Sequence, residues 1–310
     1  MSVKWVELVQ QKPRELVLSG KEVTKQIEDE NGLNEVLFRI STLNFLEVSK
    51  TNLTEIPSKI DQLSNLTNLV LSGNKLSMLP TVIGNLKKLK LLDVSYNNLE
   101  ALPDEIGNLV DLQSLLLTMN NLSSLPSSLS KLSNLHVIKF GHNKLQKFPD
   151  ALCDENLKLH LSEIHAPNNQ IEDIPSNIDN LAALKLLDLS ENKVKDVPGE
   201  LSDCSKMKDL NLKGNKLSDR RLLKLVEQGK QKQILDYIKA HCAKSRSENS
   251  EGTNGEKKSR GKDSVTETEV VDVITIVPIK MEDRKSVVAT APILEMRKIV
   301  ACIVRNVNFE

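Results

Sequence analysis

Two histidines could carry metal chemistry. His142 and His165 fall on neighbouring predicted strands, with both side chains on the same face of the predicted sheet. Imidazole nitrogens are common metal ligands, but a zinc site needs at least three protein ligands. No third ligand accompanies this pair in the sequence. The pattern therefore favours two surface histidines, and we expect no bound metal and no cofactor.

The sequence contains no complete catalytic motif. GTNGEKKS, residues 252–259, has the letters of a phosphate-binding loop at the wrong spacing. No H-E-x-x-H pair and no nucleophile elbow occurs. The four cysteines, Cys153, Cys204, Cys242 and Cys302, are scattered and form no C-x-x-C pair. We therefore expect a protein that is not an enzyme, in a reducing and thus cytoplasmic compartment.

A repeat positions these residues. Asparagines close successive copies of an L-x-x-L-x-L-x-x-N-x-L template, at steps of 23, 23, 23, 26, 23 and 23 residues. They are Asn74, Asn97, Asn120, Asn143, Asn169, Asn192 and Asn215, and an earlier copy has Thr51 at this place. This period predicts an α/β fold, a leucine-rich-repeat solenoid or horseshoe of about eight copies. Stacked copies bury each other's leucines behind a parallel concave sheet.

The second half of each copy predicts a turn and a convex segment. A proline follows an apolar residue in seven copies: Pro57, Pro80, Pro103, Pro126, Pro149, Pro175 and Pro198. Proline fixes φ and donates no hydrogen bond, so it suits a turn. We expect a short helical or 3₁₀ segment after each proline. We expect each asparagine to satisfy backbone groups where the chain leaves its strand.

Composition and pattern divide the chain into five parts. Residues 1–42 are expected to form an N-terminal cap, 43–217 the repeats, and 218–242 one or two capping helices with Asp219 or Ser218 as N-cap. Residues 243–268 are rich in Ser, Gly, Glu and Lys, which predicts a disordered linker. Residues 269–310 begin with a β-branched run and predict a partial α/β tail that is too short for its own core.

Charge and hydropathy narrow the classes of partner. Lys plus Arg and Asp plus Glu both number 42, so net charge gives no general reason to expect nucleic acid or lipid. No apolar run approaches 18 residues, so we expect no membrane span. The first residues lack the apolar core of a signal peptide.

The side chains between the repeated leucines should face the concave side. An apolar strip of Leu91, Tyr96, Leu116, Met119 and Val137 falls on adjacent predicted strands, which favours a protein interface over ordinary surface. The candidate partner-binding residues are Leu91, Asp93, Tyr96, Leu116, Met119, Val137, Lys139, His142 and His165.

The 23-residue phrase resembles intracellular scaffold-type leucine-rich-repeat proteins. LVLSGKEV near the start, STLNFLEVSKTNL at the first repeat and LSDCSKMKDLNLKGNKLSDRRLLKLVEQGKQKQILDYIK at the end resemble the leucine-rich repeat-containing protein 47 family. In that family the C-terminal part is similar to the B3/B4 domain of the phenylalanyl-tRNA synthetase β subunit. The resemblance implies that residues 269–310 are the first portion of such a domain. It also implies RNA binding and phenylalanine-tRNA ligase activity.

The sequence thus supports two functions of different classes. The favoured one is a monomeric scaffold that binds a protein partner on the concave face. The alternative is association with RNA or tRNA, and so with translation, through Lys257, Lys258, Arg260 and Lys262 and the B3/B4-like tail. Ligase activity itself is not expected, because the sequence contains no domain that would activate ATP and an amino acid.

Overall fold

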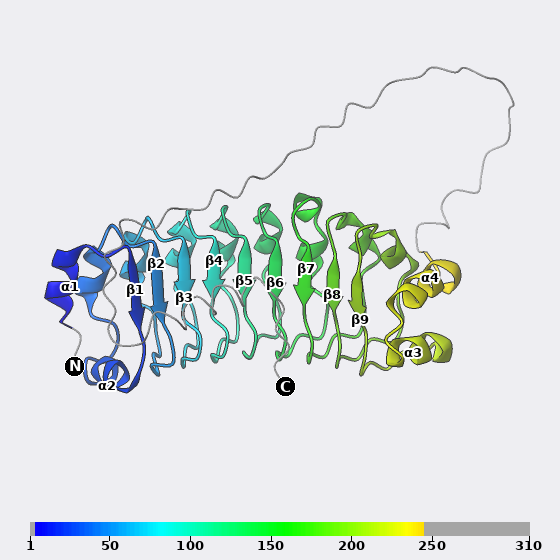
Figure 1. The fold of residues 1–310 in the computed structure, drawn as a ribbon, viewed down its shortest axis with the longest axis horizontal. Helices are drawn as coiled ribbons and strands as arrows, with labels where there is room; N and C mark the ends of the chain where they lie inside the picture. Colours follow the sequence, from blue (N-terminus) through cyan, green and yellow to red (C-terminus); the bar gives the residue numbers. More distant parts are fainter. Residues whose placement is uncertain (1–3, 245–310) are drawn as a thin grey trace, which may run out of the picture.

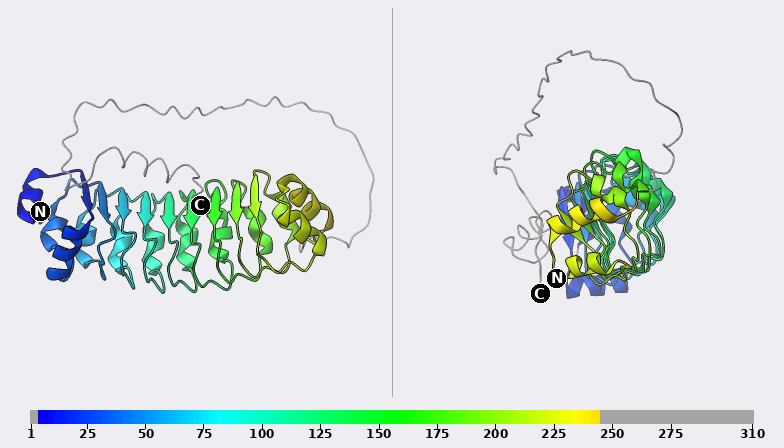
Figure 2. Two further views of the ribbon diagram at one scale, coloured as in Figure 1. Left: turned by 60° about the horizontal axis from the view of Figure 1, so that its bottom comes forward. Right: turned by 90° about the vertical axis from the view of Figure 1, so that its right-hand side faces the viewer.

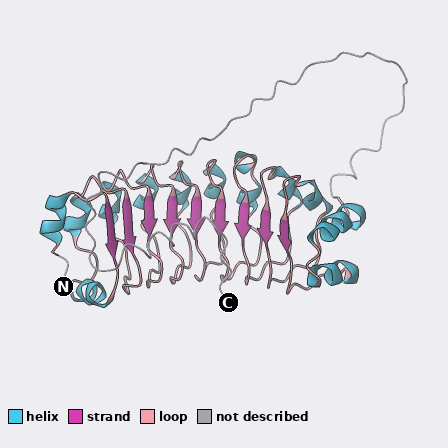
Figure 3. Cartoon of the chain, in the orientation of Figure 1, coloured by secondary structure: helices cyan, strands magenta, loops and turns pink. Residues whose placement is uncertain are grey.

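A computed structural model describes residues 4–244 of the chain (Figure 1). Nine parallel strands lie side by side in sequence order in one open sheet within this range. Their bounds are β1 Glu15–Leu18, β2 Phe45–Val48, β3 Asn68–Val70, β4 Leu91–Asp93, β5 Ser114–Leu116, β6 Val137–Lys139, β7 Glu163–His165, β8 Leu186–Asp188 and β9 Asp209–Asn211. The helices are α1 Trp5–Gln11, α2 Lys21–Asp29, α3 Arg220–Glu227 and α4 Gln231–His241. Figure 3 shows the strands in one row, with the α-helices at its two ends.

Short 3₁₀ segments form the opposite side of the solenoid (Figure 2). They are η1 Glu35–Arg39, η2 Ser58–Gln62, η3 Thr81–Asn85, η4 Asp104–Asn108, η5 Ser127–Lys131, η6 Asp150–Cys153, η7 Glu155–Leu157, η8 Ser176–Asn180 and η9 Gly199–Asp203. A repeat proline is the N-cap of seven of them, with φ between −59° and −70°. The predicted turn and 3₁₀ segment after each proline are confirmed.

The core lies between the sheet and the 3₁₀ segments. The middle residue of each strand points inward, and Leu69, Leu92, Leu115 and Ile138 are fully buried. Apolar residues of the 3₁₀ segments, such as Ile83 of η3, meet them from the other side. Burying one such side chain contributes roughly 1.5–3 kcal/mol. No single repeat has a partner for its own leucines, so stacking creates the core.

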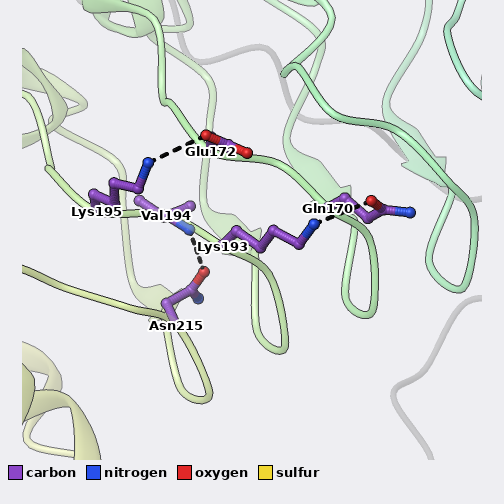
Figure 4. Close-up of polar contacts among 6 residues, drawn as sticks. All are labelled: Gln170, Glu172, Lys193, Val194, Lys195 and Asn215. Carbon is purple, nitrogen blue, oxygen red and sulfur yellow. Dashed lines mark hydrogen bonds and ion pairs between the residues drawn. The ribbon is translucent and has the colours of Figure 1, made fainter.

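The asparagines form a ladder along the core, as the sequence predicts. Asn97 Nδ2 donates to the carbonyl oxygens of Leu71 and Val94, and Asn97 Oδ1 accepts from the Leu76 N–H, each at 3.0 Å. Asn215 Oδ1 accepts from the Val194 N–H in the same way at 2.9 Å (Figure 4). Each asparagine therefore satisfies backbone groups of its own repeat and of the repeat before it.

The first repeat departs from the template without a gap in this ladder. Thr51 replaces asparagine, and its hydroxyl donates to Asn74 Oδ1 at 2.9 Å. The same oxygen accepts from the Thr51 N–H at 3.0 Å and from the Leu53 N–H at 3.2 Å. A threonine is sufficient at this position because Asn74 of the following repeat serves both backbone amides.

Both ends of the sheet are covered. At the front, β1 pairs with β2, and Trp5 Nε1 of α1 donates to the Glu30 carboxylate at 3.0 Å. At the back, Gln231 Oε1 at the start of α4 accepts from the Leu210 N–H of the edge strand β9 at 3.0 Å. Asp219 caps α3 through the N–H groups of Arg221 and Leu222, which confirms the predicted N-cap. The Gln231 contact satisfies an N–H group at the β9 edge that could otherwise pair with another strand.

The extra residues of the 26-residue step lie on the convex side. Two 3₁₀ segments, η6 and η7, stand between β6 and β7 where other repeats have one. The insertion therefore leaves the strands in register and the concave face continuous. The predicted linker beyond residue 244 and the predicted tail, 269–310, lie outside the described residues. Within residues 4–244, none of the helices has the length and apolar character needed to cross a membrane.

Candidate partner-binding face

Strand register arranges the outward side chains in columns. The sheet surface that faces away from the 3₁₀ segments is called the concave face below. From β2 to β9, the first residue of each strand forms one column: Phe45, Asn68, Leu91, Ser114, Val137, Glu163, Leu186 and Asp209. The third residue forms another: Glu47, Val70, Asp93, Leu116, Lys139, His165, Asp188 and Asn211. Because neighbouring strands lie about 4.8 Å apart, side chains in one column contact their neighbours.

A groove of about 1240 Å³ hollows the N-terminal part of this face. Its floor extends from β2 to the first residue of β7, and α2 forms one wall. The apolar floor residues are Phe45, Val70, Leu91 and Val137. A preformed concave surface with a partly apolar lining is the usual form of a binding site.

Three carboxylates lie on this floor, Glu47, Asp93 and, at its far end on β7, Glu163. Glu47 accepts a 2.6 Å hydrogen bond from Ser49 Oγ, and Asp93 accepts one of 2.9 Å from the Ser95 N–H. Burial, with a smaller contribution from the charge of Glu47, raises the pKa of Asp93 above its usual range, although Ser95 opposes the shift. The floor thus holds negative charge in a place that is only partly solvated.

The structure places three of the predicted residues in the groove: Leu91, Asp93 and Val137. Lys139 and His165 share the column of Asp93 further along the sheet, beyond the groove lining. His165 Nε2 lies 3.2 Å from Glu163 Oε2, and this hydrogen bond is the largest cause that lowers the pKa of Glu163. Lys139 is half-buried between Leu116 and His165.

Leu116 needs a correction. The sequence places it in an exposed apolar strip, but only 9% of its surface is exposed. It lies in register between Asp93 of β4 and Lys139 of β6. Leu116 therefore adds little area to the concave face.

Tyr96, Met119 and His142 need a second correction. They are not on the strands, because β4, β5 and β6 end at Asp93, Leu116 and Lys139. Each has a positive φ of 54–58° and turns the chain away from the sheet. Their N–H groups still donate to the next repeat, for example Tyr96 to the Thr118 oxygen at 2.8 Å. Tyr96 and Met119 are 59% and 42% exposed, and they form a rim rather than part of the strand face.

This geometry also separates the two candidate metal ligands. His165 faces Lys139 of β6, whereas His142 lies in the following turn and its Nε2 is 3.5 Å from Asn168 Nδ2. Within residues 4–244, no group of three or more His, Cys, Asp or Glu side chains could hold a metal ion.

Sequence reasoning missed the α2 wall. Lys21, Thr24 and Lys25 of α2 line the groove, and Thr24 Oγ1 is tied to the Lys50 carbonyl oxygen at 3.3 Å. This segment carries no repeat template, so the sequence predicts only that it belongs to the N-terminal cap. The four-residue spacing of Val23 and Ile27 in KEVTKQIED, both buried, is the signal of a helix with a polar outer face.

The comparisons with known proteins agree with this architecture. A family model described as leucine rich repeat matches residues 64–122 and 159–217. A leucine-rich-repeat protein of Leptospira interrogans is similar in structure, with a TM-score of 0.61 and 28% identity over 72% of this chain. The fold is a leucine-rich-repeat solenoid.

Two further solved structures extend the comparison. The ectodomain of the Arabidopsis thaliana receptor kinase GASSHO1/SCHENGEN3, solved in complex with Casparian strip integrity factor 2, has a TM-score of 0.56 and 30% identity over 70% of this chain. Internalin C2 of Listeria monocytogenes has a TM-score of 0.51 and 28% identity over 61% of this chain. This chain spans 61% of the Leptospira chain, 29% of the Arabidopsis chain and 78% of the Listeria chain. No curated protein sequence matches.

Proposed function

We propose that this protein is a non-enzymatic scaffold that binds a protein partner on its concave face. The observation that carries the proposal is the groove across β2–β7, with Phe45, Val70, Leu91 and Val137 on its floor. These four residues are half-buried, and solvent-accessible apolar residues surrounded by polar ones are typical of protein interfaces. The Arabidopsis ectodomain, in complex with Casparian strip integrity factor 2, is a precedent for this fold as a binding surface.

The architecture suits recognition because the floor is rigid. Every floor residue sits on a strand that is hydrogen-bonded on both sides, and the next residue along the strand is buried in the core. Binding a partner would therefore cost little free energy for ordering this surface. The proposed cytoplasmic setting and monomeric state rest on the sequence alone, on its scattered cysteines and its repeat architecture.

The test compares two charge insertions in the full chain. Leu91→Glu with Val137→Glu places carboxylates on the groove floor, whereas the control Leu159→Glu alters a leucine that is 74% exposed outside the groove. Proteins captured from cytosol are quantified by mass spectrometry after RNase treatment, with circular dichroism to confirm folding. We expect the double variant to lose partners that the wild type and the control retain. Equal capture by all three proteins would refute binding in the groove.

Association with RNA or tRNA is the second candidate. It is favoured by nine Lys and Arg against four Asp and Glu from Lys230 to Lys262, together with the sequence resemblance of the tail to a B3/B4 domain. Lys257, Lys258, Arg260 and Lys262 lie outside the described residues. This function predicts RNA binding that weakens steeply with salt.

Charge reversal separates the two candidates. Lys257→Glu, Lys258→Glu, Arg260→Glu and Lys262→Glu together should abolish RNA binding in a filter assay and leave the groove partners in place. If RNA binding survives this change but is lost in the groove variant, Leu91→Glu with Val137→Glu, the groove and not these basic residues would be the RNA site. We expect no amino-acid-dependent exchange between ATP and pyrophosphate, and detection of such exchange would contradict a non-enzymatic role.

A further inference from the structure

Glu47 and Asp93, two of the three carboxylates on the groove floor, flank one apolar residue. Register pairs Glu47 with Val70 and Val70 with Asp93, so the acids stand on either side of Val70 in one column. Two strand spacings, roughly 10 Å, separate their backbones. All three side chains line the same groove.

Neither carboxylate has a cationic partner in the described chain. Glu47 accepts from a serine hydroxyl and Asp93 from a serine N–H, and no ion pair within residues 4–244 involves either. The neighbour of Asp93 on the other side is the apolar Leu116. Partial burial of like charges without a countercharge is unfavourable, and it raises the pKa of Asp93. A bound cation would relieve this repulsion.

The cations of the groove stand at its edges. Lys21 and Lys25 come from α2, Lys50 from the turn after β2, and Lys90 directly precedes β4. A polybasic tract would be repelled by these four ammonium groups. A segment with a single cation between apolar residues avoids this repulsion and matches the acidic floor.

Building on the proposed function, we propose that the groove binds an extended peptide segment of the partner, in which one arginine or lysine reaches the floor between Glu47 and Asp93. Apolar side chains next to that cation contact Phe45 and Leu91. Arginine is preferred, because its planar guanidinium has five donors and can serve two carboxylates at once.

The experiment begins with a phage-displayed library of linear peptides selected on the full chain. Selected peptides are synthesised, and their affinities are measured by fluorescence anisotropy. The test variant is Glu47→Gln with Asp93→Asn, which keeps shape and hydrogen-bonding capacity. The matched control is Asp188→Asn, because Asp188 accepts from the Ser190 N–H at 3.0 Å just as Asp93 does from Ser95, but does not line the groove.

We expect the selected peptides to carry one arginine or lysine among apolar residues. The double variant should bind them at least about tenfold more weakly, and Asp188→Asn should bind them as the wild type does. Replacing the peptide's arginine by citrulline should weaken wild-type binding to a similar extent. Peptides without a basic residue, or with unchanged affinity for the double variant, would overturn the inference.

The groove variant, Leu91→Glu with Val137→Glu, separates the role of the carboxylates from binding in the groove as such. If the selected peptides no longer bind this variant but still bind Glu47→Gln with Asp93→Asn, only the role of the carboxylates is refuted. Peptides that bind both variants, or a selection without groove-dependent peptides, count against the groove itself.

Discussion

Asn97 and Leu76 join two successive repeats, because Asn97 Oδ1 accepts a 3.0 Å hydrogen bond from the Leu76 N–H. Asn97 Nδ2 also donates to the carbonyl oxygens of Leu71 and Val94. Asn97→Ala leaves the buried Leu76 N–H without its acceptor, whereas the Leu71 and Val94 oxygens keep hydrogen bonds from Asn74 and Asn120. One such unsatisfied buried group costs about 1–3 kcal/mol. We expect a lower urea midpoint for Asn97→Ala, and little change for the exposed neighbour Asn98→Ala. Equal midpoints for the two variants would contradict the ladder as a source of stability.

Close approach of the 3₁₀ segments gives a second prediction. A Cβ on Gly107 would lie 2.3 Å from the Ser128 carbonyl oxygen, which is far inside van der Waals contact. Gly107→Ala should force η4 and η5 apart and destabilise the protein by about 1–3 kcal/mol. Ser127→Ala, at an exposed site on the same convex side, is the control. If Gly107→Ala and the control have equal thermal midpoints, η4 and η5 can move apart without loss of stability, and the prediction is wrong.

The C-terminal cap should depend on pH through Asp219. Its carboxylate accepts from the Leu222 N–H and from the Tyr237 hydroxyl, and the backbone hydrogen bond is the largest cause of its lowered pKa. An acid whose folded pKa is lowered stabilises the fold above its unfolded pKa of about 4, and this stabilisation is lost as pH falls through the folded pKa.

Asp219→Ala should therefore cost about 1 kcal/mol at neutral pH, and the difference from wild type should shrink in acid. Denaturant titrations at pH 7 and pH 3 measure it. Glu227→Ala, an exposed acid at the end of α3, is the control. A deficit for Asp219→Ala that grows as pH falls would have the wrong sign for this account.

Asp93 should behave in the opposite sense. Its raised pKa means that ionisation opposes folding above the folded pKa. This penalty shrinks as pH falls through the folded pKa and is gone below the unfolded pKa of about 4. Asp93→Asn should thus raise the melting temperature at pH 7, with a gain that vanishes in acid. Asp188→Asn, which has the same serine contact and no Glu47 two strands away, should gain less. A loss of stability in Asp93→Asn at pH 7 would show that the charge is well accommodated.

Leucine spacing and proline position were enough to predict the solenoid, because both follow directly from burial and backbone geometry. Column membership of Asp93 and Val137 was equally accessible, since strand residues alternate between faces. Tyr96, Met119 and His142 were misplaced because spacing alone assumes an extended chain, and these residue types rarely adopt positive φ. Glycines at the equivalent positions, Gly73 and Gly214, were the available signal of a left-handed turn.

The groove itself was less predictable. Its wall comes from α2, which belongs to no repeat, and contact between α2 and the turn at Lys50 is a tertiary feature. The low exposure of Leu116, 9%, likewise depends on its surroundings between β4 and β6, which the residue type does not reveal.

Photocrosslinking from the groove floor is the most direct test of partner binding on the concave face. A photoreactive amino acid replaces Ser114, which lines the groove on β5, and in a second protein it replaces Ser130 on the convex η5. Both full-length proteins are irradiated in cytosol after RNase treatment. We predict a discrete crosslinked protein from position 114, and we predict that Leu91→Glu with Val137→Glu abolishes it. Position 130 should give no such product. Crosslinks that arise only from the convex position, or that are indifferent to the groove substitutions, would contradict it.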